Sequence, residues 1–525
     1  MVMFSVVGAY VGLRGGFERS RPASHFRTRG WLAAVLFSGA LATGATAAPL
    51  ELGDRLELMI DHYLIDRLDG VSLELAHPQR AEIVLAFDQP WEHGVNYATV
   101  LKDGPLYRLY YRGIEAGPDG DLGAAGEVTC YAESTDGIHW RKPALGLQAY
   151  RDRHDTNIIL GPDPVHRVTH NFAPFLDDRP GVPPGERYKA VGGLFHDNSA
   201  LVPDREKMRT SGGLWRFVSK DGIHWSRFGD APLFAGYALD TLNALAWLPA
   251  EQCYAIYLRT WSEGGTPDRP EFRGFRTISR STSKDFVHWT KPEPMTFGDA
   301  PMEHLYTNGT HPYFRAPHLL IALPFRFWPD RQAYPAEQQI AWGVHPTQAH
   351  GVADAVFMTS RGGTRYDRTF MESFIRPGRD PLAWHARDNA PALGVVPTGE
   401  GEMSFYAVTH YTLPDCHLRR YTLRTDGFAS AHAGYTLGAL LTKSFVFSGA
   451  ALVLNFSTSA AGNVGVELLD EADTLLAASE SLIGDDLARR VVWRDQVDVA
   501  AFAGRLVRLR FTLKDADLYS LRFQR

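Results

Sequence analysis

Short apolar and aromatic runs recur in pairs along this chain, and each run is bounded by Gly, Pro or Asp. The pairs cover residues 97–101 and 106–112, 171–175 and 188–193, 242–247 and 253–259, 311–314 and 319–326, and 403–408 and 418–423. Runs of this length and composition are typical of β-strands. No helical periodicity of three turns or more interrupts residues 60–440. The pattern therefore predicts an all-β domain built from repeated strand pairs.

A polar phrase ending in Trp follows the first three strand pairs. Its copies are Ser134–Trp140, Ser219–Trp225 and Ser283–Trp289, and decayed copies stand at 360–366 and 424–430. In this phrase Asp can bond the turn backbone, Gly accepts a positive φ, and the Trp ring packs on the layer beneath. The copies end 64 to 85 residues apart. A hairpin that returns at such spacing predicts a five-bladed β-propeller over residues 48–440.

The pattern of apolar residues and the aromatic content of the sequence change after about residue 440. Residues 451–457, 463–469, 490–493 and 505–513 are short alternating runs with few aromatic residues, and the hairpin phrase does not recur. Such runs predict a small antiparallel β-sandwich over residues 441–525.

The first 47 residues have the pattern of a secretory signal. Several Arg residues precede the apolar run 31–42, and Ala45-Thr-Ala47 forms a small-residue cleavage site. A membrane anchor is the alternative interpretation, but the apolar run is short for a span. We therefore expect a periplasmic or extracellular protein with no membrane span after cleavage.

Charge and cysteine content narrow the choice of partners. The chain has 525 residues and a net charge of −6, which becomes −10 once residues 1–47, with five Arg and one Glu, are removed. No basic stretch indicates nucleic acid, and a mildly acidic, exported protein does not suggest an anionic partner. Cys130, Cys253 and Cys416 lie in apolar runs and are expected to be buried thiols rather than disulfides or metal ligands.

In a propeller, the loops that lead into the innermost strands meet at one place, so polar residues just before those strands are the candidates for a site. Glycosidic cleavage needs one carboxyl group to protonate the leaving oxygen and another to activate water or attack carbon. The candidate acids are Asp240, Glu303 and Glu92. The candidate substrate-binding residues are Trp91, Asn96, Arg112, His170, Asn171, Asn243, Arg259, His304, Asn308, Arg326 and Glu402.

The three acids are expected to gather from different blades, with Asp240 facing Glu303. Apolar neighbours around Glu303 favour a raised pKa and the role of general acid. Hydrogen-bond donors beside Asp240 favour an ionised group that acts as base, nucleophile or stabiliser. The alternative interpretation is that Asp240 is an ordinary turn residue and that Glu92 makes a structural contact at the edge of a blade.

Other polar residues have structural alternatives. Arg112, Arg259 and Arg326 end equivalent strands, so they form either a ring of contacts between blades or part of a ligand site. The His residues of the hairpin phrase are expected to be structural. No metal-binding spacing occurs in the sequence, so no metal and no cofactor are expected.

The hairpin phrase and the segments 110–113, 171–175 and 303–308 resemble the secreted five-bladed propellers of the glycoside hydrolase family 32 and 43 superfamily, in particular its planctomycete-type members. The resemblance covers the propeller and the sandwich. It implies a furanosidase with three acidic residues from different blades. In this chain no Asp stands at the first inner strand, so the acid set is only partly assigned.

The sequence thus favours an exported glycoside hydrolase that cleaves a terminal, furanosidic bond of a carbohydrate. One alternative is a phosphorylase of the same fold, related to family 130, with phosphate held by Arg112, Arg259 and Arg326. The other is a glycan-binding propeller without catalysis that stacks sugars on Trp91, Trp261 and Trp328.

Overall fold

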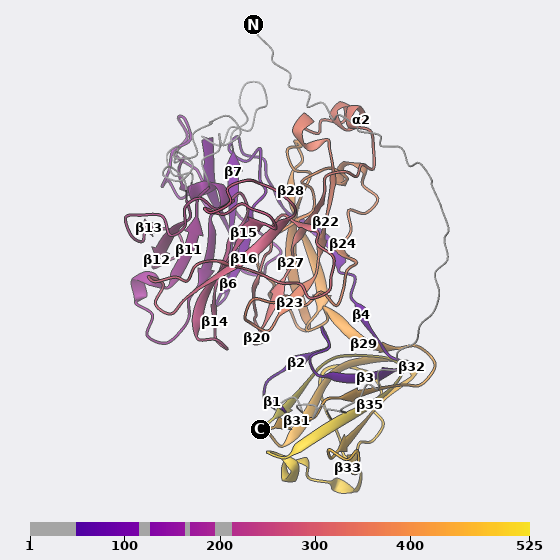
Figure 1. Cartoon of the computed structure of the whole chain (residues 1–525). Coiled ribbons are helices and arrows are strands. Elements are labelled where there is room, and N and C mark those ends of the chain that lie inside the picture. The colour runs from indigo at the N-terminus through magenta and orange to yellow at the C-terminus, as the bar shows by residue number, and fades with distance from the viewer. Residues whose placement is uncertain (1–48, 115–125, 163–167, 195–212) are drawn as a thin grey trace, which may run out of the picture. The chain divides into compact units, whose positions relative to one another are not determined.

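A computed structural model describes residues 49–114, 126–162, 168–194 and 213–525 (Figure 1). The predicted signal segment 1–47 lies outside the described residues. Within them, α2 (Ala336–Ala341) is the α-helix, and 3-10 turns occur at 168–171, 184–186, 346–348, 381–383, 494–496 and 499–502. None of the described helices has the length and apolar character of a membrane span. The prediction of an all-β chain is confirmed.

Three four-stranded antiparallel sheets follow one another along the chain, and in each the strands pair in sequence order. The first contains β6 (Ala98–Asp103), β7 (Leu106–Ile114), β8 (Glu127–Ser134) and β9 (Ile158–Leu160). The second contains β10 (Ala173–Leu176), β11 (Tyr188–Gly192), β12 (Trp215–Ser219) and β13 (Trp225–Arg227). The third contains β14 (Ala244–Leu248), β15 (Cys253–Trp261), β16 (Arg276–Ser283) and β17 (Glu293–Pro294).

Residues 304–375 form two sheets of short strands rather than one sheet. They are β19-β20-β23 and β18-β21-β22-β24. The strands are β18 (His304–Leu305), β19 (His311–Tyr313), β20 (Ala316–Ala322), β21 (Phe325–Trp328), β22 (Val352–Val356), β23 (Met358–Ser360) and β24 (Ser373–Ile375). Pro324 separates β20 from β21, and a proline has no N–H to offer a ladder. Its carbonyl still accepts a hydrogen bond from Val356 N at 3.0 Å, which keeps the neighbouring strand beside it.

A further sheet takes its outer strand from far upstream. Its strands pair in the order β25-β27-β28-β5, with β26 also on β27. They are β25 (Ala390–Pro391), β26 (Val396–Gly399), β27 (Glu402–Thr409), β28 (His417–Arg424) and β5 (Gln79–Ala86). The segment just before β6 therefore joins the sheet that contains β28 and ties the two ends of this region together.

The first strands of successive sheets contact one another. β6 touches β10, β10 touches β14, β14 touches β19, and β26 touches β6. Val395 N donates to His311 Nε2 at 3.2 Å, which connects the β19 segment to the β26 segment. Val100 N donates to Leu393 O at 2.8 Å, so the last sheet meets the first. These contacts bring the starts of the sheets to a common region.

The hairpin phrase folds in the same way at its three full copies. Asp136, Asp221 and Asp285 each accept two backbone N–H bonds at 2.8–2.9 Å and contact the His three residues later. Each Trp indole donates to the carbonyl three residues before it, at 3.1 Å. The His residues of the phrase are thus held within the turns, as expected.

Eleven strands form the largest sheet of the described residues. They are β1 (Leu50–Gly53), β2 (Glu57–Leu58), β3 (Ile65–Asp69), β4 (Ser72–Leu75), β29 (Ala429–Ala433), β30 (Gly438–Thr442), β31 (Phe445–Phe447), β32 (Ala451–Leu469), β33 (Leu475–Ala478), β34 (Asp485–Arg490) and β35 (Leu506–Gln524). The long strands β32 and β35 pair along most of their length (Figure 1). Residues 50–75 and 429–440 belong to this sheet, although their sequence placed them in the first region. Their strands hydrogen-bond to β30, β31 and β35. Several of their apolar side chains, such as Leu52, Ile65 and Ala431, belong to the buried cluster that β30, β31 and β35 also line.

Cys130, Cys253 and Cys416 are buried and unpaired, as expected.

Candidate functional site

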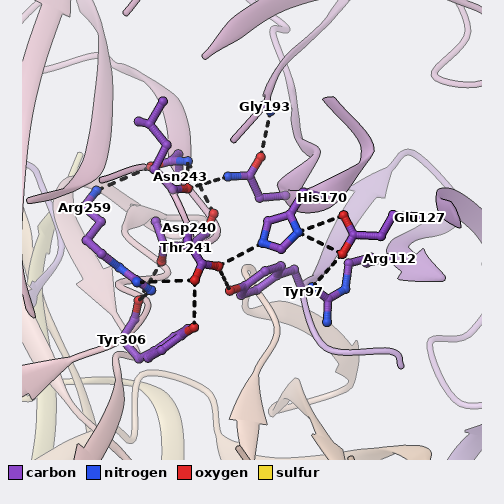
Figure 2. A network of polar contacts seen from close by, with 12 residues as sticks. Tyr97, Arg112, Glu127, His170, Gly193, Asp240, Thr241, Asn243, Arg259 and Tyr306 are labelled. Atoms are coloured by element: carbon purple, nitrogen blue, oxygen red, sulfur yellow. Dashed lines mark hydrogen bonds and ion pairs between the residues drawn. The ribbon is translucent and has the colours of Figure 1, made fainter. Parts of the chain in front are cut away.

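Asp240 lies in the loop that precedes β14, where side chains from several sheets meet (Figure 2). Its carboxylate accepts hydrogen bonds from His170 Nε2 at 2.9 Å, Tyr97 OH at 3.1 Å and Tyr306 OH at 3.3 Å. The Asp240 side chain is 29% exposed, so solvent or a ligand can reach it. One partly open carboxylate is therefore held by groups from three separate parts of the chain.

His170 connects Asp240 to a second carboxylate. His170 belongs to the 3-10 turn Val168–Asn171, and its Nδ1 lies 2.8 and 2.9 Å from the two oxygens of Glu127, the first residue of β8. Both ring nitrogens thus face carboxylates, an arrangement that favours the doubly protonated ring. Burial alone would lower the pKa of His170, but the charges of Glu127 and Asp240 outweigh it and raise that pKa.

The same contacts keep Asp240 ionised. Burial would raise the pKa of Asp240, but the hydrogen bond from His170 and the charge of Arg259 bring it well below its ordinary value. The centre is therefore a histidine ring between two carboxylates, which favours its protonated form, and the Asp240 carboxylate is ionised.

Arg112 forms an ion pair with Glu127, the carboxylate that contacts His170 Nδ1. Its Nη1 lies 3.3 Å from Glu127 Oε1, and its Nη2 donates to Gly94 O and to Tyr411 OH, both at 3.1 Å. Arg112 and Glu127 have side chains only 4% and 2% exposed. Since a buried charge needs a partner, this pair fixes Glu127 behind His170.

Two amide side chains and Arg259 hold the loop that carries Asp240. Asn171 and Asn243 donate to Leu239 O at 2.7 and 3.2 Å, and Asn171 also accepts from Gly193 N. Arg259 Nη2 donates to Tyr306 O at 2.8 Å, and its Nη1 lies 4.0 Å from Asp240 Oδ2. The backbone of the loop is thus fixed on both sides of the carboxylate.

Glu92 does not join this network. It is fully buried, and its carboxylate accepts hydrogen bonds from Tyr111 OH and Lys142 Nζ at 2.5 Å and from Gln89 N at 3.0 Å. The neighbouring Trp91 is also buried, and its indole donates to Asn157. In the described structure both residues hold the first sheet together and offer no stacking face.

Glu303 and Arg326 belong to a separate ion-pair cluster. Glu303 accepts from Arg326 Nη1 at 3.0 Å and from Arg368 Nη2 at 2.6 Å, and Arg326 also binds Asp354 at 2.6 and 2.8 Å. Among the described residues, no hydrogen bond or ion pair joins Glu303 to Asp240. The immediate partners of the Glu303 carboxylate are guanidinium groups rather than the apolar side chains expected from its sequence neighbours, and Arg326 does not stand with Arg112 and Arg259.

The remaining predicted residues have local partners. His304 accepts from Arg276 N at 3.1 Å, Asn308 donates to Tyr257 O at 3.1 Å, and Glu402 pairs with Arg420 at 2.7 Å. Asn96 is 3% exposed. Of the predicted set, Asp240, His170, Asn171, Asn243, Arg112 and Arg259 are brought together.

Sequence reasoning missed Glu127, Tyr97 and Tyr306 as members of the site. Tyr97 directly precedes β6, and the sequence pattern assigned it to an apolar strand. Tyr306 likewise lies among apolar residues in its segment. Glu127 begins the third strand of its sheet, whereas the sequence-based candidates lie ahead of first strands or at the ends of second strands. The feature of the sequence that could have identified Glu127 is a charged residue at the start of an apolar strand.

Neither a metal cage nor a large cavity marks the Asp240 network. No group of three or more His, Cys, Asp or Glu side chains in the described part of the chain could hold a metal ion. A cavity of about 990 Å³ in the described residues is lined by residues such as Val100, Phe175, Trp247 and Pro312 and contains no member of the network. The site is therefore defined by its polar contacts and not by the volume of a pocket.

No protein-family model matches this sequence, and neither does any curated protein sequence. Solved structures with a similar chain trace include a family 43 arabinoxylan arabinofuranohydrolase from Bacillus subtilis, at 12% identity and a TM-score of 0.36, over 83% of this chain and 96% of that one. A Bombyx mori family 32 β-fructofuranosidase matches at 9% identity and 0.39, over 84% and 94%. An N-acetylgalactosamine deacetylase from F. plautii matches at 12% and 0.43, over 68% and 96%. At this level the similarity assigns neither an activity nor a catalytic residue to the chain.

Proposed function

We propose that this chain is a glycoside hydrolase whose reacting centre is the Asp240–His170–Glu127 network. The observation that carries the proposal is a partly exposed carboxylate bonded to a histidine ring whose other nitrogen faces a second carboxylate. Glycosidic cleavage requires such a pair: a charged group that activates water or attacks carbon, and a proton donor for the leaving oxygen.

Each member of the network has a role that follows from its contacts. Asp240 is the base or nucleophile, because it is ionised and reachable. His170 is the proton donor of the proposal; because acid and base act on opposite sides of the glycosidic bond, its Nε2–H must exchange the Asp240 carboxylate, 2.9 Å away, for the leaving oxygen when substrate binds. Glu127 is a positioning residue that acts through His170, because it fixes the ring from the Nδ1 side. Glu92 and Glu303 are not retained as acids, since their side chains are only 0% and 8% exposed, whereas the Asp240 side chain is 29% exposed.

The proposal extends to the number of blades, the type of glycosidic bond and the export of the protein. We infer a five-bladed propeller, supported by the first strands that touch in succession and by the outer strand β5, and a sandwich for the eleven-stranded sheet. A furanosidic substrate is proposed on the resemblance alone. Export is proposed on the signal pattern of residues 1–47.

The proposal is tested with the purified chain starting at Ala48 on a panel of aryl furanosides, aryl pyranosides and natural oligosaccharides. On any substrate that the wild type cleaves, Asp240→Asn and His170→Gln should each lower kcat by at least about a hundredfold. Glu303→Gln is the matched control and should keep kcat within about threefold if it folds. Full activity in both Asp240→Asn and His170→Gln, or a hundredfold loss in a folded Glu303→Gln, would contradict the assignment.

A further inference from the structure

The Asp240 site contains more positive charge than its own carboxylates require. Arg112 and Arg259 stand beside Glu127 and Asp240, as described above. Two further guanidinium groups lie close to the Tyr306 ring: those of Arg276 in β16 and of Arg387, which precedes β25. The guanidinium carbons of Arg259, Arg387 and Arg276 are 4.1, 5.3 and 5.5 Å from the centre of the Tyr306 ring. Tyr306 itself donates to Asp240.

Neither of the two additional arginines has a carboxylate partner among the described residues. Arg276 bonds only to the His304 ring, through its backbone N at 3.1 Å and its Nη1 at 3.5 Å, and its Nε is buried without a partner. Arg387 makes no hydrogen bond or ion pair in the part of the chain that the structure describes, although it is only partly exposed. Burial, followed by the charge of Arg259, lowers the pKa of Arg276 to about 10, which still leaves it charged near neutral pH.

Two carboxylates, Glu127 and Asp240, therefore face four guanidinium groups, those of Arg112, Arg259, Arg276 and Arg387. Partly buried cations without partners are costly for the free protein, and a bound anion removes that cost. Guanidinium groups are also the donors that suit planar or tetrahedral oxyanions, because they offer forked N–H pairs. The global charge of the chain is negative, so this excess is a property of the site and not of the whole molecule.

We propose that the substrate of this site is an anionic sugar, whose carboxylate or sulfate group is bound by Arg276 and Arg387. The inference deepens the proposed glycosidase function by naming its substrate class.

The test measures binding and needs no turnover. Asp240→Asn protein is applied to an array of matched oligosaccharides: uronic acid oligomers beside their carboxyl-reduced forms, and sulfated oligomers beside their desulfated forms. We expect at least tenfold tighter binding of the charged member of a pair, and the pair that responds identifies the anion. Adding Arg387→Gln or Arg276→Gln should remove about tenfold of that preference, and Arg387→Lys should restore part of it.

Arg489→Gln is the control, since Arg489 pairs with Asp486 in the eleven-stranded sheet and touches no part of the site. Each variant is first checked for an unchanged melting temperature, and the two glutamine variants are independent, so one misfolded protein does not decide the result. Equal or absent binding of charged and neutral members, or an undiminished preference in a folded arginine variant, overturns the inference. Binding of charged oligosaccharides by the Asp240→Asn protein, with no hydrolysis of any glycoside by the wild type, would refute the glycosidase proposal and leave the inference standing. Hydrolysis by the wild type of neutral glycosides alone would do the reverse.

Discussion

Replacing Glu127 by Gln tests whether the buried charge chain is organised as described. The change keeps the size of the side chain and removes one charge from a pair whose side chains are 2% and 4% exposed. It leaves the Arg112 guanidinium with only neutral partners, Gly94 O and Tyr411 OH. Breaking a buried ion pair from one side costs about 3–5 kcal/mol. For a chain of this size the entropy of unfolding is about 1 kcal/mol/K, so the melting temperature should fall by about 3–5 °C.

The same substitution should change how His170 titrates. Glu127 is the largest contributor that raises the pKa of His170 against burial, so that pKa should fall in the variant. A raised histidine pKa stabilises the fold at pH values below the unfolded value of 6.5, and this contribution is lost as pH rises through the folded pKa. The stability difference between wild type and Glu127→Gln should therefore be larger at pH 5.5 than at pH 9.

The assays are thermal unfolding across that pH range and an NMR titration of His170, with Glu82→Gln as control. Glu82 also pairs with an arginine, Arg420, at 2.8 Å, but its side chain is 55% exposed, and its loss should cost less than about 1 kcal/mol. If Glu127→Gln unfolds within about 1 °C of Glu82→Gln and the His170 titration does not move, the reasoning about the buried network is refuted.

Two further predictions concern residues outside the site. Burial raises the pKa of Asp388 to about 7 from 3.8, so the folded protein retains a proton that the unfolded chain releases, and stability should fall as pH rises between about 4 and 7. Asp388→Asn should flatten this fall in denaturant titrations at pH 4.5 and 7.5, and an unchanged slope would count against it. Gly222 has φ +76°, and a Cβ there would stand 2.6 Å from Tyr110 OH, whereas Gly104, with φ +57°, faces open space. Gly222→Ala should therefore lower the urea midpoint more than Gly104→Ala, which bears only the backbone cost of about 1 kcal/mol; equal shifts would show that the turn does not pack as described.

The sequence by itself determined the strands and the repeated turn, because both depend on neighbours in the chain. The paired apolar runs became β6 and β7, β14 and β15, and β27 and β28, and Asp136, Asp221 and Asp285 cap their turns through residues two and three positions away. A position ahead of an inner strand was likewise enough to select Asp240 and His170, and a position at the end of a second strand was enough to select Arg259. The sequence could not show that the strands 50–75 complete the C-terminal sheet, since that pairing spans most of the chain.

Only the tertiary structure decided which charges meet. Glu127 lies 43 residues from His170, and His170 lies 70 residues from Asp240, so nothing in the local pattern marked the three as one network. Glu303 has apolar sequence neighbours, yet Arg326 and Arg368, 23 and 65 residues away, occupy its carboxylate. Backbone conformation is set by short-range sterics and turn hydrogen bonds, whereas the state of a carboxylate depends on whichever charges and dipoles the fold brings within a few ångströms.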